Sequence, residues 1–302
     1  MIKRIASIVG TEMSVVMGQA VQVRQLSRVS GGDICDSFKA QTNIGPLFVK
    51  RCSAQDGDLL RAEFKNLQLL HARAEIRVPE AKSVSFHEND TLLVMEYLDL
   101  AGSTHDCQLG RRLAALHRHT GSVYGLEYDN YIGRTFQKNT AEERWSVFWW
   151  NNRLLPQLQM ACDQGFSSAV EKYVRPLNDV CQQLLHDHQP VPSLLHGDLW
   201  GGNKGYLKDT TPVIFDPACY FGDRETDVAL TELFSGFDAE FYREYQEVWP
   251  LDDGYRYRKL LYNLYHLLNH LNLFGELYLA SCLKQIQGLL VLKESGRIVD
   301  IK

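Results

Sequence analysis

Hydrophobic and polar positions follow a helical spacing at the start of the chain and an alternating spacing soon afterwards. The N-terminal 18 residues place Ile2, Ile5 and Ile8 on one face of a helix. The pattern then alternates over short segments separated by glycine-bearing turns, which predicts an antiparallel meander. Three strands are expected there: VQVRQLSRVS (21–30), ICDSFKAQT (34–42) and PLFVKRC (46–52).

Helical spacing returns over residues 56–73, where an apolar stripe predicts one long helix. Two further strands are expected in RVPEAKSVSF (77–86) and TLLVMEYL (91–98). These elements complete a β-rich N-terminal part that contains one long helix. A linker-like stretch follows near residues 98–105.

The remainder of the chain is mainly helical in pattern, with helices expected at 142–160 and 168–187. A loop-rich stretch at 190–224 interrupts the helices. The sequence therefore predicts an α+β fold of two parts, an N-terminal domain at 1–98 and a helical domain at 99–302.

Composition narrows the class of protein. The 302 residues are 45% hydrophobic with a formal net charge of −5, which argues against a nucleic-acid binder because such proteins are usually basic. The seven cysteines are scattered and form no C-x-x-C pair, so we expect reduced thiols rather than a disulfide or zinc framework. No apolar run reaches the roughly 18–20 residues of a membrane span. We expect a cytoplasmic protein without membrane contact, and its oligomeric state, monomer or weak dimer, stays open.

The loop-rich stretch contains LLHGDLWGGNKG and then VIFDP, which place Asp198, Asn203 and Asp216 in order on loops. Turn chemistry alone explains such residues, because Asp and Asn bond their own backbone readily. Phosphoryl transfer from ATP is the alternative. It needs a carboxylate to orient the attacking hydroxyl and oxygen ligands for Mg²⁺. Asp198 is the candidate base, and Asn203 and Asp216 are the candidate metal ligands.

The N-terminal part offers the matching phosphate-binding residues. Lys50 ends a predicted strand, and Glu63 on the following helix could pair with it. Gly31 and Gly32 lie in a turn where the backbone could approach phosphate closely. Each feature alone is common on turns, strand ends or solvated helix faces. Together, the features have the same order and the same Asp-to-Asn spacing as the protein-kinase signature.

Longer segments make the similarity more specific. HGDLWGGN, FDPACYFGDRETDVALTELFSGF and LYHLLNHLNLFG resemble the fructosamine kinase family, within the wider aminoglycoside phosphotransferase and choline kinase-like group. SGGDI followed by GPLFVK matches that family's N-terminal lobe. The resemblance runs from about residue 20 to residue 290. It implies a bilobal protein-kinase-like fold and ATP-dependent phosphorylation of ketosamines, free or protein-bound, which are the sugar–amine adducts of glycation.

The resemblance also implies roles for individual residues. Asp198 is the catalytic base, Asn203 and Asp216 bind Mg²⁺, and Lys50 with Glu63 positions the phosphates. A further set would contact adenine through its backbone: Met95, Glu96, Tyr97 and Leu98. Two departures stand out, because the glycine turn reads SGGDIC rather than G-x-G-x-x-G and the metal-binding Asp is followed by Pro-Ala. No activation-loop switch is therefore expected.

Two alternatives remain open for the function. The chain could phosphorylate another small hydroxyl compound, such as an aminoglycoside or choline. It could also be a nucleotide-binding pseudokinase that acts as an interaction module, although all the expected catalytic residues are present.

Several further residues have a structural and a functional interpretation. We expect His196 to brace the loop, and Asp227 and Arg224 to support it from the next helix. Trp200 could stack on the sugar or wedge the loop, and Cys35 could be a passive thiol or a site where oxidation blocks ATP binding. The two histidines of HLLNH are four residues apart, as in a zinc site. The glutamate next to the first histidine that H-E-x-x-H requires is absent, so we do not expect zinc there. The aromatic run WSVFWWNNR is expected in the core, and the NHLNLFG segment is expected to line the substrate end of the site.

Overall fold

The computed structural model describes residues 1–29, 35–100 and 106–295. It divides into two compact units. The first consists of Met1–Thr104 with Lys204–Pro217, and the second of His105–Asn203 with Ala218–Lys302. Residues 204–217 thus group with the N-terminal residues, although the sequence pattern places them inside the predicted 99–302 domain. The assignment of an ATP-binding and a catalytic domain stays a prediction.

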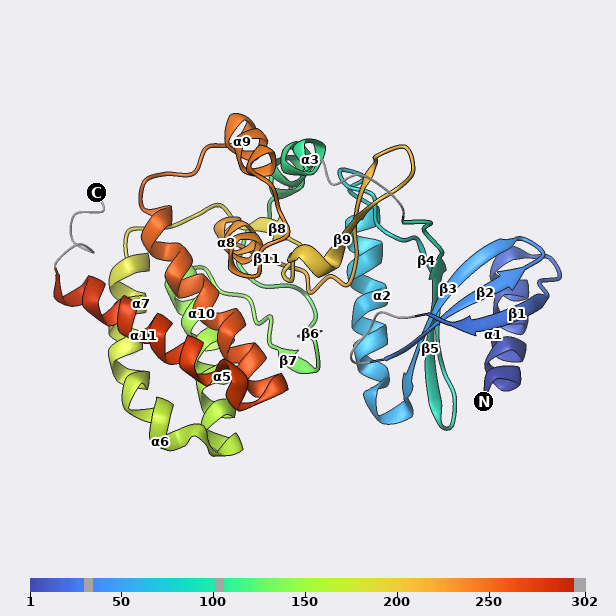
Figure 1. The fold of residues 1–302 in the computed structure, drawn as a ribbon, viewed down its shortest axis with the longest axis horizontal. Helices are drawn as coiled ribbons and strands as arrows, with labels where there is room; N and C mark the ends of the chain where they lie inside the picture. The colour runs from blue at the N-terminus through green and yellow to red at the C-terminus, as the bar shows by residue number, and fades with distance from the viewer. Residues whose placement is uncertain (30–34, 101–105, 296–302) are drawn as a thin grey trace. The chain divides into compact units, whose positions relative to one another are not determined.

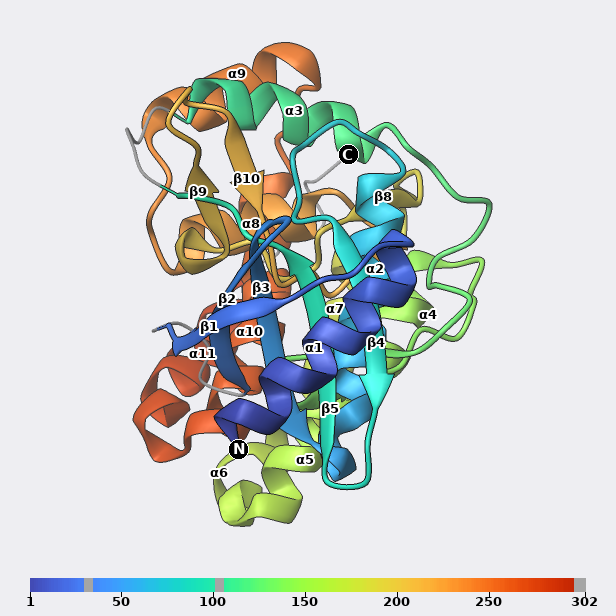
Figure 2. The same cartoon turned by 90° about the vertical axis from the view of Figure 1, so that its right-hand side faces the viewer.

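The first unit is a five-stranded antiparallel sheet between two helices (Figures 1 and 2). The strand order is β1-β2-β3-β5-β4. The strands are β1 (Val23–Arg28), β2 (Asp36–Thr42), β3 (Gly45–Ser53), β4 (Ala81–Phe86) and β5 (Asp90–Glu96), and the helices are α1 (Ile2–Met17) and α2 (Gly57–His71). All five predicted strands and both predicted helices are therefore confirmed.

Alternation along β3 separates two environments. Leu47 and Val49 join Ile5 and Val9 of α1 in one buried cluster. Since side chains alternate along a strand, Lys50 and Cys52 belong to the opposite face. Helix α2 contacts β3, β4 and β5, and its Glu63 bonds Lys50.

A small hairpin completes the first unit. It pairs β9 (Lys204–Tyr206) with β10 (Pro212–Ile214). Isolated bridges join it to the N-terminal residues, Arg77 with Val213 and Leu100 with Leu207. The chain then leaves this unit directly after Asp216 and Pro217.

The second unit is mainly helical. Its helices are α3 (Cys107–His117), α4 (Trp145–Trp149), α5 (Leu155–Ala161), α6 (Ser167–Val170), α7 (Val174–Leu185), α8 (Glu225–Leu233), α9 (Ala239–Val248), α10 (Tyr255–Phe274) and α11 (Leu279–Glu294). A π-helical turn at Trp150–Leu154 joins α4 to α5. Two short ladders, β6 (Asn130–Ile132) with β7 (Thr135–Gln137) and β8 (Ser193–Leu195) with β11 (Tyr220–Gly222), lie among the helices. The alternation over three residues is too short to predict these ladders.

Aromatic side chains dominate the core of the second unit. Trp145, Phe148 and Trp149 are fully buried. Trp149 lies 4.9 Å from the ring of Tyr262 on α10, edge to face. The prediction that the WSVFWWNNR run belongs to the core is confirmed. Within the described part of the chain, no helix is long and apolar enough to cross a membrane.

Candidate active site

A cluster of three charged side chains forms within the first unit. The Lys50 ammonium donates to Glu63 Oε1 at 2.7 Å and to Asp216 Oδ1 at 2.6 Å. The side chains of Lys50 and Glu63 are only 12% and 14% exposed, whereas that of Asp216 is 42% exposed. The structure thus brings together three of the residues predicted from the sequence, from β3, α2 and the turn after β10.

The charges of this cluster do not balance. Burial alone would lower the pKa of Lys50, but the carboxylates of Asp216 and Glu63 outweigh burial and raise it. Burial raises the pKa of Glu63 to about 7, and repulsion from Asp216 acts in the same direction against the attraction of Lys50. Two carboxylates therefore compete for one ammonium, which is an arrangement that an additional cation would relieve.

The backbone at Asp216 adopts an unusual conformation. Its φ of 58° lies in the left-handed region, which Asp and Asn tolerate better than most residues. The next carbonyl, Pro217 O, accepts a hydrogen bond of 2.8 Å from Asn66 Nδ2 on α2. Helix α2 thereby fixes both the lysine and the turn that carries Asp216. The sequence analysis did not single out Asn66; its signal is a polar position three residues after Glu63 on the same helical face.

A second group of predicted residues meets on the loop after β8, in the second unit. Asn203 Nδ2 donates to the backbone oxygen of Asp198 at 2.8 Å and to its carboxylate Oδ2 at 3.1 Å. The Asp198 N–H donates to His196 Nδ1 at 3.2 Å. His196 is fully buried and braces the loop, as expected.

Buried Asp227 holds the start of this loop. Its Oδ2 accepts from the backbone N–H of His196 at 2.7 Å, and its Oδ1 accepts from that of Gly197 at 2.9 Å. His117 Nε2 lies 3.2 Å from Oδ2. Burial would raise the pKa of Asp227, but the hydrogen bond and charge of His117 and the other donors lower it. The expected support by Asp227 is confirmed, and fully buried His117 adds a contact to its carboxylate.

Gly197 is required by the geometry of the loop. Its φ is 82°, and a Cβ atom there would lie 2.0 Å from the carbonyl oxygen of Ala218. Any side chain at this position would therefore push the loop away from Ala218. The guanidinium of Arg224 donates to Tyr245 Oη on α9 and to Trp249 O just after α9, so these bonds of Arg224 hold α9 and not the loop itself.

Aromatic rings extend from the loop along α10. Trp200, 40% exposed, lies edge to face with Phe234 at 6.5 Å between ring centroids. Phe234 in turn lies 4.5 Å from His270, which contacts Phe274. This row, which we call the aromatic row, begins two residues after Asp198. His266 is the first histidine of the HLLNH pair, and burial lowers its pKa to about 3. One group of potential metal ligands is found in the described residues, and it does not include His266.

That group consists of His188, Asp223 and Glu225. Asp223 accepts hydrogen bonds from His188 Nε2 at 2.7 Å and from Tyr262 Oη at 2.6 Å. Arg258 donates to both carboxylate oxygens of Glu225, at 2.7 and 2.6 Å. The arginine already supplies the positive charge, so we interpret this group as a structural network.

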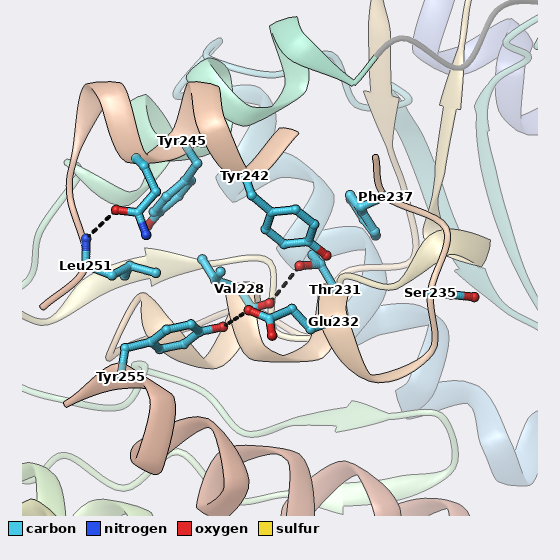
Figure 3. Close-up of a pocket in the computed structure, with 10 residues that line it drawn as sticks. Val228, Thr231, Glu232, Ser235, Phe237, Tyr242, Tyr245, Leu251 and Tyr255 are labelled. Carbon is cyan, nitrogen blue, oxygen red and sulfur yellow. Dashed lines mark hydrogen bonds between the residues drawn. The ribbon is translucent and has the colours of Figure 1, made fainter. Parts of the chain in front are cut away.

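A pocket of 490 Å³ lies between α8, α9 and the start of α10 (Figure 3). Tyrosines form much of its wall, and Tyr255 Oη donates to Glu232 at 2.6 Å. Lys259 also bonds Glu232. The carboxylate in this pocket is thus neutralised by the protein, and we assign no ligand to it.

The predicted adenine-binding residues lie at the end of β5 and beyond it. Met95 is buried. The Glu96 carboxylate accepts a hydrogen bond from Arg77, and the Glu96 backbone N–H donates to Glu80 O at 2.9 Å. Lys39 lies 3.9 Å above the ring of Tyr97. Leu98 O accepts from the N–H of Leu100. Predicted Gly31 and Gly32 lie outside the described residues.

Comparisons with known proteins identify relatives of this chain. A family model for fructosamine kinases matches residues 5–292. A Vibrio parahaemolyticus protein assigned as a ketoamine kinase is 41% identical over 263 residues, which cover 85% of this chain and 90% of that protein. The chloroplastic protein-ribulosamine 3-kinase of Arabidopsis thaliana is 38% identical over 277 residues, 90% of this chain and 85% of that protein.

Solved structures show the same fold. A Haemophilus somnus 129PT protein assigned as a fructosamine-3-kinase has a TM-score of 0.87 and 28% identity, with 93% of this chain and 96% of that chain covered. A thermostable variant of aminoglycoside phosphotransferase APH(4)-Ia, solved with ADP and hygromycin B, has a TM-score of 0.62 at 15% identity over 93% of this chain and 97% of that chain. The second likeness concerns the fold alone, and it confirms the predicted kinase-like class.

Proposed function

The chain belongs to the fructosamine kinase family, and on that premise we propose that it transfers the γ-phosphate of ATP to a sugar hydroxyl of a ketosamine. Its relatives are named as ketoamine and protein-ribulosamine kinases. The acceptor is therefore a sugar–amine adduct, and ribulosamines are its first candidates. The product is a phosphorylated sugar that remains attached to its amine.

One observation carries this proposal. Lys50 bonds both Glu63 and Asp216 within a single cluster. In kinases, the strand lysine is positioned by a helix glutamate, and a separate aspartate binds the metal. The alternative is that Lys50 is an ordinary solvated lysine at a strand end. Such a lysine is not expected to have two buried or half-buried carboxylate partners.

Asp198 serves as the base in this proposal. Its carboxylate would accept the proton of the acceptor hydroxyl as that oxygen attacks the γ-phosphorus. The Asn203 amide bonded to Oδ2 fixes the orientation of the carboxylate, and Asp227 fixes the loop backbone. Little reorganisation is then needed when the substrate binds, which is how positioning lowers the barrier.

Each of the two proposed ligands suits Mg²⁺. Asp216 offers a carboxylate and Asn203 an amide oxygen, and magnesium prefers hard oxygen ligands. The Asn203 nitrogen already donates to Asp198, so its oxygen is the atom left to bind a cation. Magnesium would supply neutralisation of the charge on the transferred phosphoryl group. Lys50 would hold the phosphates, and the backbone of residues 95–98 would bond adenine.

The aromatic row is our candidate for the acceptor surface. Sites for small polar ligands combine aromatic walls with a few polar groups. Trp200 follows the base by two residues and keeps 40% of its surface exposed. We therefore favour its stacking on the sugar over a purely structural role.

The test is a substrate panel. Purified protein would be incubated with Mg-ATP and with ribulose-lysine, fructose-lysine, kanamycin or choline, while ADP release and the mass of each product are followed. Asp198→Ala serves as the control. We expect phosphate on a ketosamine, faster with ribulose-lysine, and none in the control.

Other outcomes separate the alternatives. Phosphate on kanamycin or choline alone would keep the mechanism and replace the substrate class. Tight ATP binding with no turnover of any compound would favour the pseudokinase. Phosphate transfer that persists in Asp198→Ala would contradict the assignment of the base.

A further inference from the structure

Two cysteine sulfurs lie in direct contact in the first unit. Cys35 Sγ is 2.8 Å from Cys52 Sγ. Neither residue is in a disulfide bond in the structure.

The strand register explains this contact. Strands β2 and β3 pair antiparallel, with Asp36 opposite Arg51 and Ser37 opposite Lys50. Continuing this register by one residue places Cys35 directly opposite Cys52. Residues that face each other across an antiparallel pair have Cα atoms about 4.5–5.5 Å apart. That separation lies within the range that a disulfide spans.

The neighbouring pair, Asp36 and Arg51, supports the same register from the other face of the sheet. Arg51 donates to Asp36 Oδ2 at 3.0 Å. The two thiols therefore meet because the sheet holds their strands in place. They do not depend on a mobile side chain to bring them together. Closing the contact from 2.8 Å to the roughly 2.0 Å of a disulfide needs only a small movement.

The two thiols differ in exposure. Cys52 is 4% exposed, while Cys35 is half-buried. The hydrogen bond with Cys35 and burial raise the pKa of the Cys52 thiol. Cys52 therefore keeps its proton, and Cys35 is the sulfur that an oxidant in solution meets first.

We propose that Cys35 and Cys52 form an intrachain disulfide when the protein meets a hydroperoxide. This modification site is independent of the proposed kinase activity. It ties the first described residue after the glycine turn to the strand that carries Lys50.

The chemistry proceeds in two balanced steps. The Cys35 sulfur attacks a peroxide oxygen, the O–O bond breaks, and a sulfenic acid and water form from hydrogen peroxide. The Cys52 sulfur then attacks the sulfenic sulfur, the S–O bond breaks, and the hydroxyl leaves as water with the Cys52 proton. The two sulfurs lose two electrons in total, and the peroxide gains them.

The bond closes the loop formed by β2, its turn and β3. Closing such a loop restricts the unfolded chain more than the folded one. We expect the first unit to unfold at a temperature a few degrees higher after oxidation, and dithiothreitol to reverse the shift.

The experiment treats reduced, folded protein with stoichiometric hydrogen peroxide, blocks remaining thiols with iodoacetamide and digests with trypsin. Lys39 and Lys50 lie between the two cysteines, so trypsin separates them unless a disulfide joins them. The expected product is one linked peptide pair, two hydrogens lighter than the sum of the reduced peptides. Native protein on a non-reducing gel should stay monomeric in size.

Three variants complete the test. Cys35→Ser and Cys52→Ser should each abolish the linked pair and the thermal shift, while Cys107→Ser should retain both. Cys35 is half-buried, so its serine variant is the one expected to fold without difficulty. Alkylation of both cysteines after peroxide, a bond between two chains, or a shift that persists in Cys35→Ser would overturn the proposal.

Discussion

The charged cluster of the first unit and the Asp198 loop of the second are held by different forces. Lys50, Glu63 and Asp216 are held by ion pairs among themselves, and one carboxylate is nearly half exposed. The Asp198 loop is held by backbone hydrogen bonds to the buried carboxylate of Asp227. An ion-pair cluster could exchange partners on binding the phosphate proposed for it, because charge attracts without strict direction. The proposed base must stay where it is, and directional hydrogen bonds serve that need.

The largest expected effect lies in the second unit. Asp198→Ala should lower kcat about 10²–10⁴-fold, because a positioned general base contributes that much. ATP affinity should stay within about twofold, since Asp198 itself is assigned no contact with the nucleotide. Steady-state kinetics and calorimetry with Mg-ATP measure the two quantities. Asp187→Ala, an exposed site in the same unit, is the matched control and should behave as wild type. A large loss of ATP affinity in Asp198→Ala would contradict the proposal that Asp198 acts on the acceptor hydroxyl and not on the nucleotide.

The first unit should show the opposite pattern. Asp216→Asn removes the charge of a proposed magnesium ligand and keeps its shape, so Mg-dependent nucleotide binding should weaken at least about tenfold. Binding of nucleotide without magnesium should change little. Asp99→Asn, an exposed carboxylate of the same unit that pairs with Lys208, is the control. Unchanged Mg-ATP affinity in Asp216→Asn would rule out the metal role.

A smaller effect should distinguish support from chemistry. Asp227→Asn leaves a single acceptor oxygen for two backbone N–H groups, so the loop loses one charged hydrogen bond, worth about 1.5–3 kcal/mol. We expect kcat to fall about ten- to a hundredfold with ATP affinity retained. A variant that loses nucleotide affinity instead would show that Asp227 does not act through the Asp198 loop alone.

The smallest effect concerns pH. Burial would lower the pKa of His188, but Asp223 outweighs burial and raises it, with Arg258 opposing and Glu225 assisting. A histidine with a raised pKa adds stability that is complete below its unfolded pKa of about 6.5 and is lost as pH rises through the folded pKa. His188→Gln should therefore unfold a few degrees below wild type near pH 6 and approach it near pH 9, measured as Tm against pH. A difference that stays constant with pH would mean that the pair acts by packing.

Sequence reasoning reached different depths in the two units. Alternation and helical spacing predicted the five strands and α2, because each has one apolar and one polar face. It also predicted Lys50, Glu63 and Asp216, because their roles depend on residue types at recognisable places on strands, helices and turns. It did not single out Asn66, because the partner is the backbone oxygen of Pro217, which no residue type marks in a sequence. The contact of His117 with Asp227 was likewise not predicted, since it depends on how the helices pack.

The pairing of Cys35 with Cys52 shows the same limit at shorter range. The strands were predictable, but their register was not. A shift of one residue would have turned one of the cysteines to the other face. Gly31 and Gly32, the adenine contacts and the metal ligands remain predictions, and the Asp216→Asn measurement tests one of the metal ligands.

The left-handed backbone of Asp216 also restricts which amino acids a mutational library could recover there. Its φ of 58° suits Asn and Gly but penalises β-branched and bulky residues. Most substitutions would disturb the turn before they altered any chemistry, so a screen for function would report two defects as one. Asparagine keeps both the backbone preference and the shape of the side chain. It is thus the replacement at this position from which the value of the negative charge alone can be learned.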